Sequence, residues 1–245
     1  MLQGEPTSYY FNYVAREDHH RVADICNYIG YDVAVVGNHD IETGHDVFDS
    51  YVDSCNFPVL GANVISTQTD EPYFQPYTIL KRSGVKIAVI GFITAAIPQW
   101  IPHQIWHDMR FEGVRKSAEK WVRIVKETEQ LDYVIGLFHS GMSEGIETEQ
   151  YKENEVGDVA REVAGFDLIL YGHDHSSNME TLLNPEGKEV LCLNPGCHAV
   201  SVAEVDITFD LNDENKVESR QTNAKIQYIG GLRNTNTVEN MRMFM

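Results

Sequence analysis

The sequence has no apolar run of the ~18 residues that a membrane-spanning helix needs. Residues 1–6 also lack the basic and apolar regions of a signal peptide. The four cysteines form no CxxC pair, and they indicate no compartment. Basic residues are few, because 19 Lys and Arg stand against 37 Asp and Glu, for a formal net charge of -18. That negative field repels phosphate backbones, which argues against a nucleic-acid-binding protein, whereas it suits a bound cation.

The strongest local signal is an apolar run that ends in three polar residues. Residues 33–36 read Val-Ala-Val-Val, which is typical of a strand buried on both faces, because a half-exposed strand would alternate apolar and polar residues. Gly37 lets the backbone turn sharply after this run. We therefore expect Asn38, His39 and Asp40 to project from the carboxyl end of the strand, where open α/β sheets place their ligands.

The same arrangement occurs twice more along the chain. Apolar residues 133–138 run into His139, and residues 167–171 run into Gly172-His173-Asp174-His175. Three such strands would bring amide, imidazole and carboxylate groups to one edge of a sheet. That composition is typical of a metal site with a catalytic histidine.

The wider pattern alternates helices with buried strands, which favours a mostly parallel sheet flanked by helices in one α/β domain. After residue 175 the period-two pattern indicates antiparallel strands of a second sheet. The region 98–107 reads as a loop whose aromatic side chains either pack on the core or line a cleft, and 210–225 reads as a surface turn. The predicted helices are 7–29, 44–55, 114–130 and 155–164, and the further strands are 57–64, 77–81, 86–93, 189–193 and 200–209.

The three polar motifs, Gly37-Asn38-His39-Asp40, His139-Ser140-Gly141 and Gly172-His173-Asp174-His175, resemble those of the calcineurin-like metallophosphoesterases in order and in strand-end placement. Residues 3–10, 57–64 and 84–94 look like the bacterial 5′-nucleotidase / 2′,3′-cyclic-nucleotide phosphodiesterase branch. The resemblance covers nearly the whole chain. It implies a four-layer α/β/β/α sandwich of two mixed sheets, with metal ions at the strand ends.

The resemblance also implies roles for individual side chains. Asn38, His139 and His173 would hold one metal ion, and His175 would help to hold a second. Two divalent ions, of Mn, Fe, Zn or Co, would then activate a bridging water for attack on a phosphate ester. The substrate implied is a small-molecule phosphate ester, in particular a nucleotide.

Catalysis of the ester cleavage would fall to the motif after the first strand. By the resemblance, His39 would contact the phosphoryl oxygen or the leaving group, and Asp40 would hold its imidazole. A carboxylate partner of this kind fixes the tautomer of a catalytic histidine.

Two features of the family have no counterpart here. They are an Asp-x-His motif after the first strand and a Gly-Asp pair before Gln3-Gly4. The segment Asp18-His19-His20 fits Asp-x-His, but it lies inside a predicted helix, and we read His19 and His20 as solvated.

These departures lead us to expect that residues 1–245 form a single catalytic domain that lacks the first strand, the first metal motif and a C-terminal substrate domain. The alternative is an impaired or inert fragment, or a binding domain. Members of the family are often periplasmic or extracellular, but the sequence itself defines neither a compartment nor an oligomeric state.

One motif favours a different chemistry. Residues 141–145 read Gly-Met-Ser-Glu-Gly, which fits the Gly-x-Ser-x-Gly nucleophile elbow of serine hydrolases. The elbow requires Ser143 at a tight turn between a strand and a helix. Here His139 and Ser140 intervene after the strand, and the following residues are strongly polar.

Overall fold

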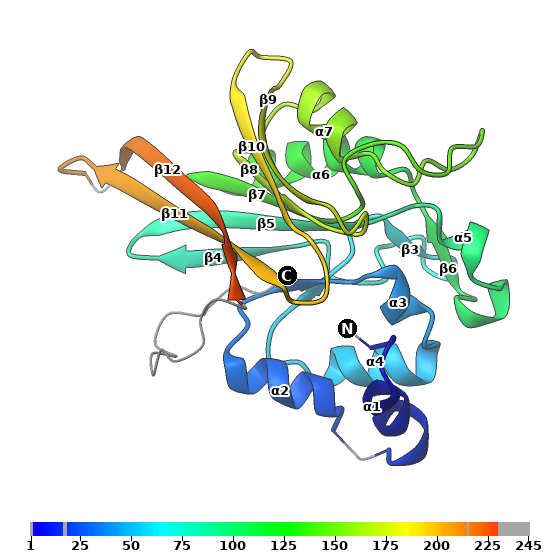
Figure 1. The fold of residues 1–245 in the computed structure, drawn as a ribbon. Helices are drawn as coiled ribbons and strands as arrows, with labels where there is room; N and C mark the ends of the chain where they lie inside the picture. The colour runs from blue at the N-terminus through cyan, green and yellow to red at the C-terminus, as the bar shows by residue number, and fades with distance from the viewer. Residues whose placement is uncertain (1, 17–18, 215, 230–245) are drawn as a thin grey trace.

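Residues 2–16, 19–214 and 216–229 are described in the computed structural model (Figure 1). The helices in these ranges are α1 (Pro6–Tyr9), the π-helix η1 (Tyr10–Val14), α2 (Arg21–Ile29), α3 (Asn38–Ile41), α4 (His45–Ser54), α5 (Ile97–Trp100), the 3₁₀-helix η2 (His103–Ile105), α6 (Val114–Thr128) and α7 (Val156–Glu162). The strands are β1 (Ala34–Val35), β2 (Val59–Leu60), β3 (Val64–Ser66), β4 (Tyr77–Arg82), β5 (Val85–Ile93), β6 (Met109–Phe111), β7 (Tyr133–His139), β8 (Leu168–Tyr171), β9 (Ser177–Leu183), β10 (Glu189–Pro195), β11 (Ser201–Leu211) and β12 (Val217–Tyr228). No helix in the described ranges combines the length and apolar character needed to cross a membrane.

The main sheet has six strands in the order β4-β5-β7-β8-β10-β9. The central strands β5, β7, β8 and β10 run parallel, while β4 and β9 pair antiparallel at the two edges. Every residue of β8 is buried, as expected for a parallel strand covered on both faces. The register pairs Ile93 with His139, so the ends of β5 and β7 meet at the same sheet edge.

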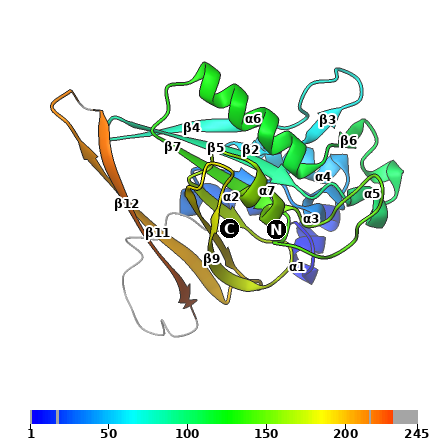
Figure 2. The same cartoon turned by 90° about the horizontal axis from the view of Figure 1, so that it is seen from above.

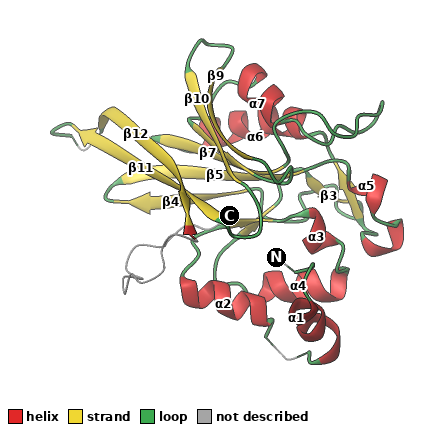
Figure 3. Ribbon diagram, in the orientation of Figure 1, coloured by secondary structure: helices red, strands yellow, loops and turns green. Residues whose placement is uncertain are grey.

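Helices α6 and α7 cover one face of the main sheet (Figures 2 and 3). Helix α6 buries Val114, Ala118, Val122 and Val125, which recur at three- and four-residue spacing and therefore share one side of the helix. They pack with Phe92, among others, in one hydrophobic cluster.

The opposite face of the sheet packs on a second β layer. Leu137 and Leu170 lie in a cluster with Val35 of β1 and Phe209 of β11. The parallel pair β1-β2 and the antiparallel hairpin β11-β12 form this layer, and α2 and α4 pack on the outer side of β1-β2 through a third cluster. The four-layer α/β/β/α order is thus confirmed (Figure 1). The second layer consists of two separate strand pairs.

Several local predictions differ from the structure. The predicted helix 7–29 is divided among α1, η1 and α2. Strand β10 lies in the main sheet between β8 and β9, not in a second sheet, and β9 was missed. The predicted surface turn 210–225 is wrong, because most of it belongs to β12. Strand β12 pairs only with β11 and leaves much of its length exposed. Its residues are therefore largely polar, and its sequence lacks the apolar run that marks a core strand.

Candidate active site

The first part of the site is the turn between β1 and α3. Val36 N–H donates to the Leu60 carbonyl as the strand ends. The Asp40 carboxylate then accepts Gly37 N–H through Oδ2 at 2.9 Å and Leu2 N–H through Oδ1 at 3.1 Å. Asp40 is only 7% exposed, so these bonds satisfy a buried charge and fix the turn that presents Asn38.

Asn38 faces His139, the last residue of β7. The Asn38 Oδ1 atom accepts a hydrogen bond from His139 Nε2 at 2.7 Å, joining two elements 101 residues apart in the sequence. The close approach requires glycine at position 37, since an added Cβ would lie 2.9 Å from His139 Cε1.

His173 lies beside His139. Their ring centroids are 5.2 Å apart, and the Trp100 ring lies 5.6 Å from His173. His173 has a φ of 81°, an uncommon backbone conformation for a residue other than glycine that turns the chain as it leaves β8. Trp100 is 38% exposed, whereas Trp106 in the same region donates its indole N–H to the Ile101 carbonyl.

Sequence reasoning missed Glu153. Its Oε1 atom lies 3.0 Å from His173 Nε2, and both side chains are largely buried. Glu153 belongs to the long loop between β7 and α7, so no apolar strand precedes it to mark its position. The one signal available was its place in the polar stretch that follows the His139 motif.

Burial determines the charge of the two imidazoles. Desolvation, together with the nearby His173, lowers the pKa of His139 to about 3. Desolvation also lowers the pKa of His173, although Glu153 opposes the shift. Both rings are therefore neutral at neutral pH, the form in which histidine offers a lone pair to a metal ion.

The predicted contact between Asp40 and His39 is not the one formed. His39 Nδ1 lies 2.7 Å from Gln3 Oε1 and 2.9 Å from Glu42 Oε2. The Asp40 carboxylate instead accepts backbone N–H groups of the turn. Leaving these buried N–H groups without an acceptor would cost more free energy than the carboxylate would gain from a contact with the neighbouring His39. The His39 side chain is 56% exposed, so it lies at the surface of the site.

His175 stands apart from the other three predicted ligands. Its ring contacts His198, with centroids 6.0 Å apart, and both residues are exposed. It is close enough to His173 to contribute to lowering the pKa of that residue. The structure thus joins Asn38, His139 and His173 in one chain of contacts and leaves His175 at its edge.

The donor set of this chain of contacts fits one divalent ion. Two ligand atoms about 2.1 Å from an ion and at right angles lie about 3 Å apart. The separation of Asn38 Oδ1 and His139 Nε2 is similar, at 2.7 Å, so a cation between them would replace the shared proton. Within the described ranges, however, no three His, Cys, Asp or Glu side chains are grouped to hold a metal. The two-ion centre implied by the resemblance is therefore not assembled by these residues.

The serine-hydrolase reading of residues 141–145 is wrong. Strand β7 ends at His139 and the next helix starts at Val156, so Ser143 lies in an exposed turn rather than between a strand and a helix. The geometry that would present a nucleophile and its oxyanion hole is missing there.

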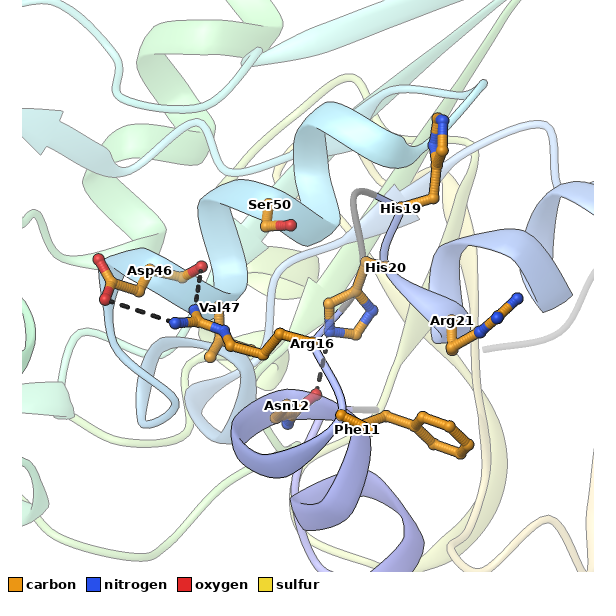
Figure 4. A pocket seen from close by; sticks show the side chains of 10 residues that line it. Phe11, Asn12, Arg16, His19, His20, Arg21, Asp46, Val47 and Ser50 are labelled. Carbon is orange, nitrogen blue, oxygen red and sulfur yellow. Dashed lines mark hydrogen bonds and ion pairs between the residues drawn. The ribbon is translucent and has the colours of Figure 1, made fainter.

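A separate hollow lies between η1 and α4 (Figure 4). It shares no lining residue with the site. His20 lines it and accepts the Val22 N–H at the start of α2, while its Nε2 atom lies 3.0 Å from Asn12 Oδ1. His20 is thus buried, contrary to the expectation that it is solvated. Asp18, the first residue of the possible Asp-x-His motif, lies outside the described residues.

Comparisons with known proteins agree with this fold. The family model described as calcineurin-like phosphoesterase matches residues 4–177. A 2′,3′-cyclic-nucleotide 2′-phosphodiesterase/3′-nucleotidase of Haemophilus influenzae is 28% identical over 71% of this chain and 28% of its own length. A 5′-nucleotidase of Vibrio vulnificus is 33% identical over 59% of this chain and 26% of its own.

Among solved structures, the calcineurin-like phosphoesterase YfkN from Bacillus subtilis superposes with a TM-score of 0.78. The match covers 94% of this chain and 75% of that one, at 24% sequence identity. These findings confirm the expected branch and the fold. The chain spans roughly a quarter of the length of the two curated relatives it matches.

Proposed function

Because the chain belongs to the calcineurin-like phosphoesterase family, we propose that it hydrolyses phosphate esters at the site formed by Asn38, His139 and His173. The observation that carries the proposal is the 2.7 Å contact between Asn38 Oδ1 and His139 Nε2, with the neutral ring of His173 beside it. The fold brings these strand ends to one edge, and an amide oxygen with two neutral imidazoles at that edge is a set of groups that can bind a divalent cation.

Asn38, His139 and His173 would hold one divalent ion. An ion bound there supplies positive charge for the phosphoryl oxygens and acidifies a coordinated water. The chain's own contribution is to keep both imidazoles neutral by burial and to hold the amide oxygen on the turn braced by Asp40. Because both rings are already neutral, neither has to release a net proton to solvent before binding, and His139 has only to move its one proton from Nε2 to Nδ1.

His39 is the proposed proton donor to the leaving oxygen. Its Nδ1 atom faces Gln3 and Glu42, so Nε2 is the atom left to deliver the proton. The carboxylate of Glu42, 2.9 Å from Nδ1, orients the imidazole for that transfer. Glu42 thus takes the role that the resemblance implied for Asp40.

Nucleotides are the proposed substrate class, supported by two observations. The relatives named above are described as nucleotidases and as a cyclic-nucleotide phosphodiesterase. In addition, the partly exposed ring of Trp100 lies beside His173, where a flat base or aryl group could stack on it.

A phosphatase assay on the purified chain tests the proposal. We expect hydrolysis of p-nitrophenyl phosphate and of 2′,3′-cyclic AMP that requires added Mn²⁺, stops with EDTA, and is lost in Asn38→Ala and His139→Ala. His19→Ala, at an exposed histidine outside the site, is the matched control and should keep the wild-type rate.

The alternative is a metal-binding domain without turnover, which the one-ion donor set favours. Metal binding lost in His139→Ala, with no hydrolysis in any variant, would support that alternative. Hydrolysis that persists in His139→Ala would refute the proposed site.

A further inference from the structure

The loop between β7 and α7 (Figure 1) carries two acidic residues that are not exposed. Glu155 accepts Val114 N–H at the start of α6 at 2.6 Å, whereas Glu153 lies at the site. Its backbone carbonyl accepts the hydroxyl of Thr94, directly after β5, at 2.8 Å and the hydroxyl of Ser140, directly after β7, at 2.9 Å. The loop is thereby fastened to two adjacent strand ends at the sheet edge that carries the site.

The Glu153 side chain, like its backbone carbonyl, is held by two hydrogen-bond contacts. One carboxylate oxygen, Oε2, accepts Ile146 N–H at 2.7 Å, and the other, Oε1, lies 3.0 Å from His173 Nε2. Only 17% of the Glu153 side chain and 10% of the His173 side chain is exposed. Glu144, Glu147 and Glu149 of the same loop are all exposed. Of the two carboxylates that this loop keeps out of solvent, Glu153 is the one within hydrogen-bond distance of an imidazole of the site.

The chemistry of this contact assigns the proton on His173. An ionised carboxylate only accepts hydrogen bonds, so Nε2 must be the donor. A neutral imidazole carries a single N–H, which leaves the lone pair on Nδ1. Carboxylates that accept the second N–H of a metal-ligating histidine fix its tautomer and raise its basicity, and their loss costs about 10- to 100-fold in metal affinity.

We infer that Glu153 is a positioning residue that holds His173 as the Nε2–H tautomer, so that Nδ1 is the atom offered to a divalent cation. This inference rests on the proposed function for the identity of the ligand, but the tautomer itself does not. The two can therefore fail separately.

The tautomer is measured first, on the metal-free full chain. Histidine ¹⁵N chemical shifts at about pH 8, above the ordinary histidine pKa of about 6.5, distinguish the two neutral forms. We expect His173 in the wild type to be the Nε2–H form, and in Glu153→Ala to become a mixture of both. A wild-type His173 protonated on Nδ1, or a tautomer unchanged in Glu153→Ala, would overturn the inference.

Metal affinity is measured second, by calorimetric titration with Mn²⁺. We expect the Kd of Glu153→Ala to rise about 10- to 100-fold. Glu153→Gln should lose less, because its amide oxygen can still accept from His173, and Glu149→Gln, on the exposed part of the same loop, should bind as the wild type does. Thermal unfolding of each variant separates lost affinity from lost folding.

Each outcome of the titration decides something. A Kd of Glu153→Ala within about twofold of the wild type, in a folded variant, would contradict a positioning role. No binding by the wild type would refute the proposed function, while the ¹⁵N shifts would still decide the role of Glu153.

Discussion

Adding one methyl group at Gly37 should damage the site without removing any of its functional groups. The added Cβ would lie 2.9 Å from Cε1, 3.1 Å from Nδ1 and 3.2 Å from Nε2 of His139. Comfortable separations between carbon atoms are about 3.5–4.0 Å, so the ring must move by several tenths of an ångström. The backbone at position 37 has φ -113° and ψ 165°, which alanine adopts freely. The clash with His139 is therefore the cause of any effect.

Overpacking of this size typically costs about 1–3 kcal/mol of folding free energy. In Gly37→Ala the shift of His139 would also pull Nε2 away from Asn38 Oδ1, and we expect Mn²⁺ affinity to fall by about tenfold, as when a residue supporting a metal ligand is removed. Urea unfolding gives the first quantity and calorimetric titration the second.

The matched control is Gly172→Ala, immediately before His173. An added Cβ at Gly172 would meet no atom within 4 Å, and its φ is not in the left-handed region. This variant should be as stable as the wild type or up to about 1 kcal/mol more stable, because alanine restricts the unfolded chain. Equal behaviour of the two alanine variants would refute the idea that Gly37 makes room for His139.

Three further predictions concern stability, pH and substrate. Asn63 is fully buried and donates to the Ile93 and Glu112 carbonyls while accepting Ile93 N–H, so Asn63→Ala should lose about 2–4 kcal/mol in urea unfolding, at roughly 0.5–1.5 kcal/mol per hydrogen bond. The folded-state pKa values of His139 and His173 lie below 6.5, so the unfolded chain binds more protons as the pH falls. The contribution of these two histidines to the free energy of unfolding of the metal-free protein should therefore be complete above about pH 6.5 and be lost progressively toward pH 3. Thermal unfolding across that range would show this loss of stability, and a flat profile would contradict it. Trp100→Ala should raise KM for nucleotides but not for a small alkyl phosphate, and an equal change for both substrates would rule out stacking on its ring.

The sequence revealed the parts of the site that follow apolar strands. Asn38, His139 and His173 each follow an apolar run. The register of the parallel strands β7 and β8 brings His139 and His173 to one sheet edge, and Asn38 reaches the same edge from the separate pair β1-β2. Glu153 has no such marker, because its place depends on hydroxyl groups directly after β5 and β7 that hold the loop through its backbone. Tertiary contacts of this kind leave no periodic pattern in the sequence.

The role of Asp40 shows a second limit of sequence reasoning. Adjacency to His39 suggested a partner, but the unpaired N–H groups of Gly37 and Leu2 needed a buried acceptor. The cost of leaving them unsatisfied is greater than the gain from a surface contact with an exposed imidazole. Strand β12 was missed for a related reason, since an edge strand with exposed polar residues resembles a turn in composition.

Titration of Mn²⁺ into the wild-type chain and into His139→Ala, followed by calorimetry, tests the metal site on which the proposed hydrolysis depends. We expect the wild type to bind one ion per chain and His139→Ala to bind none at the same concentrations. Equal binding by the two proteins, or no binding by either, would contradict the assignment of Asn38, His139 and His173 as a metal site.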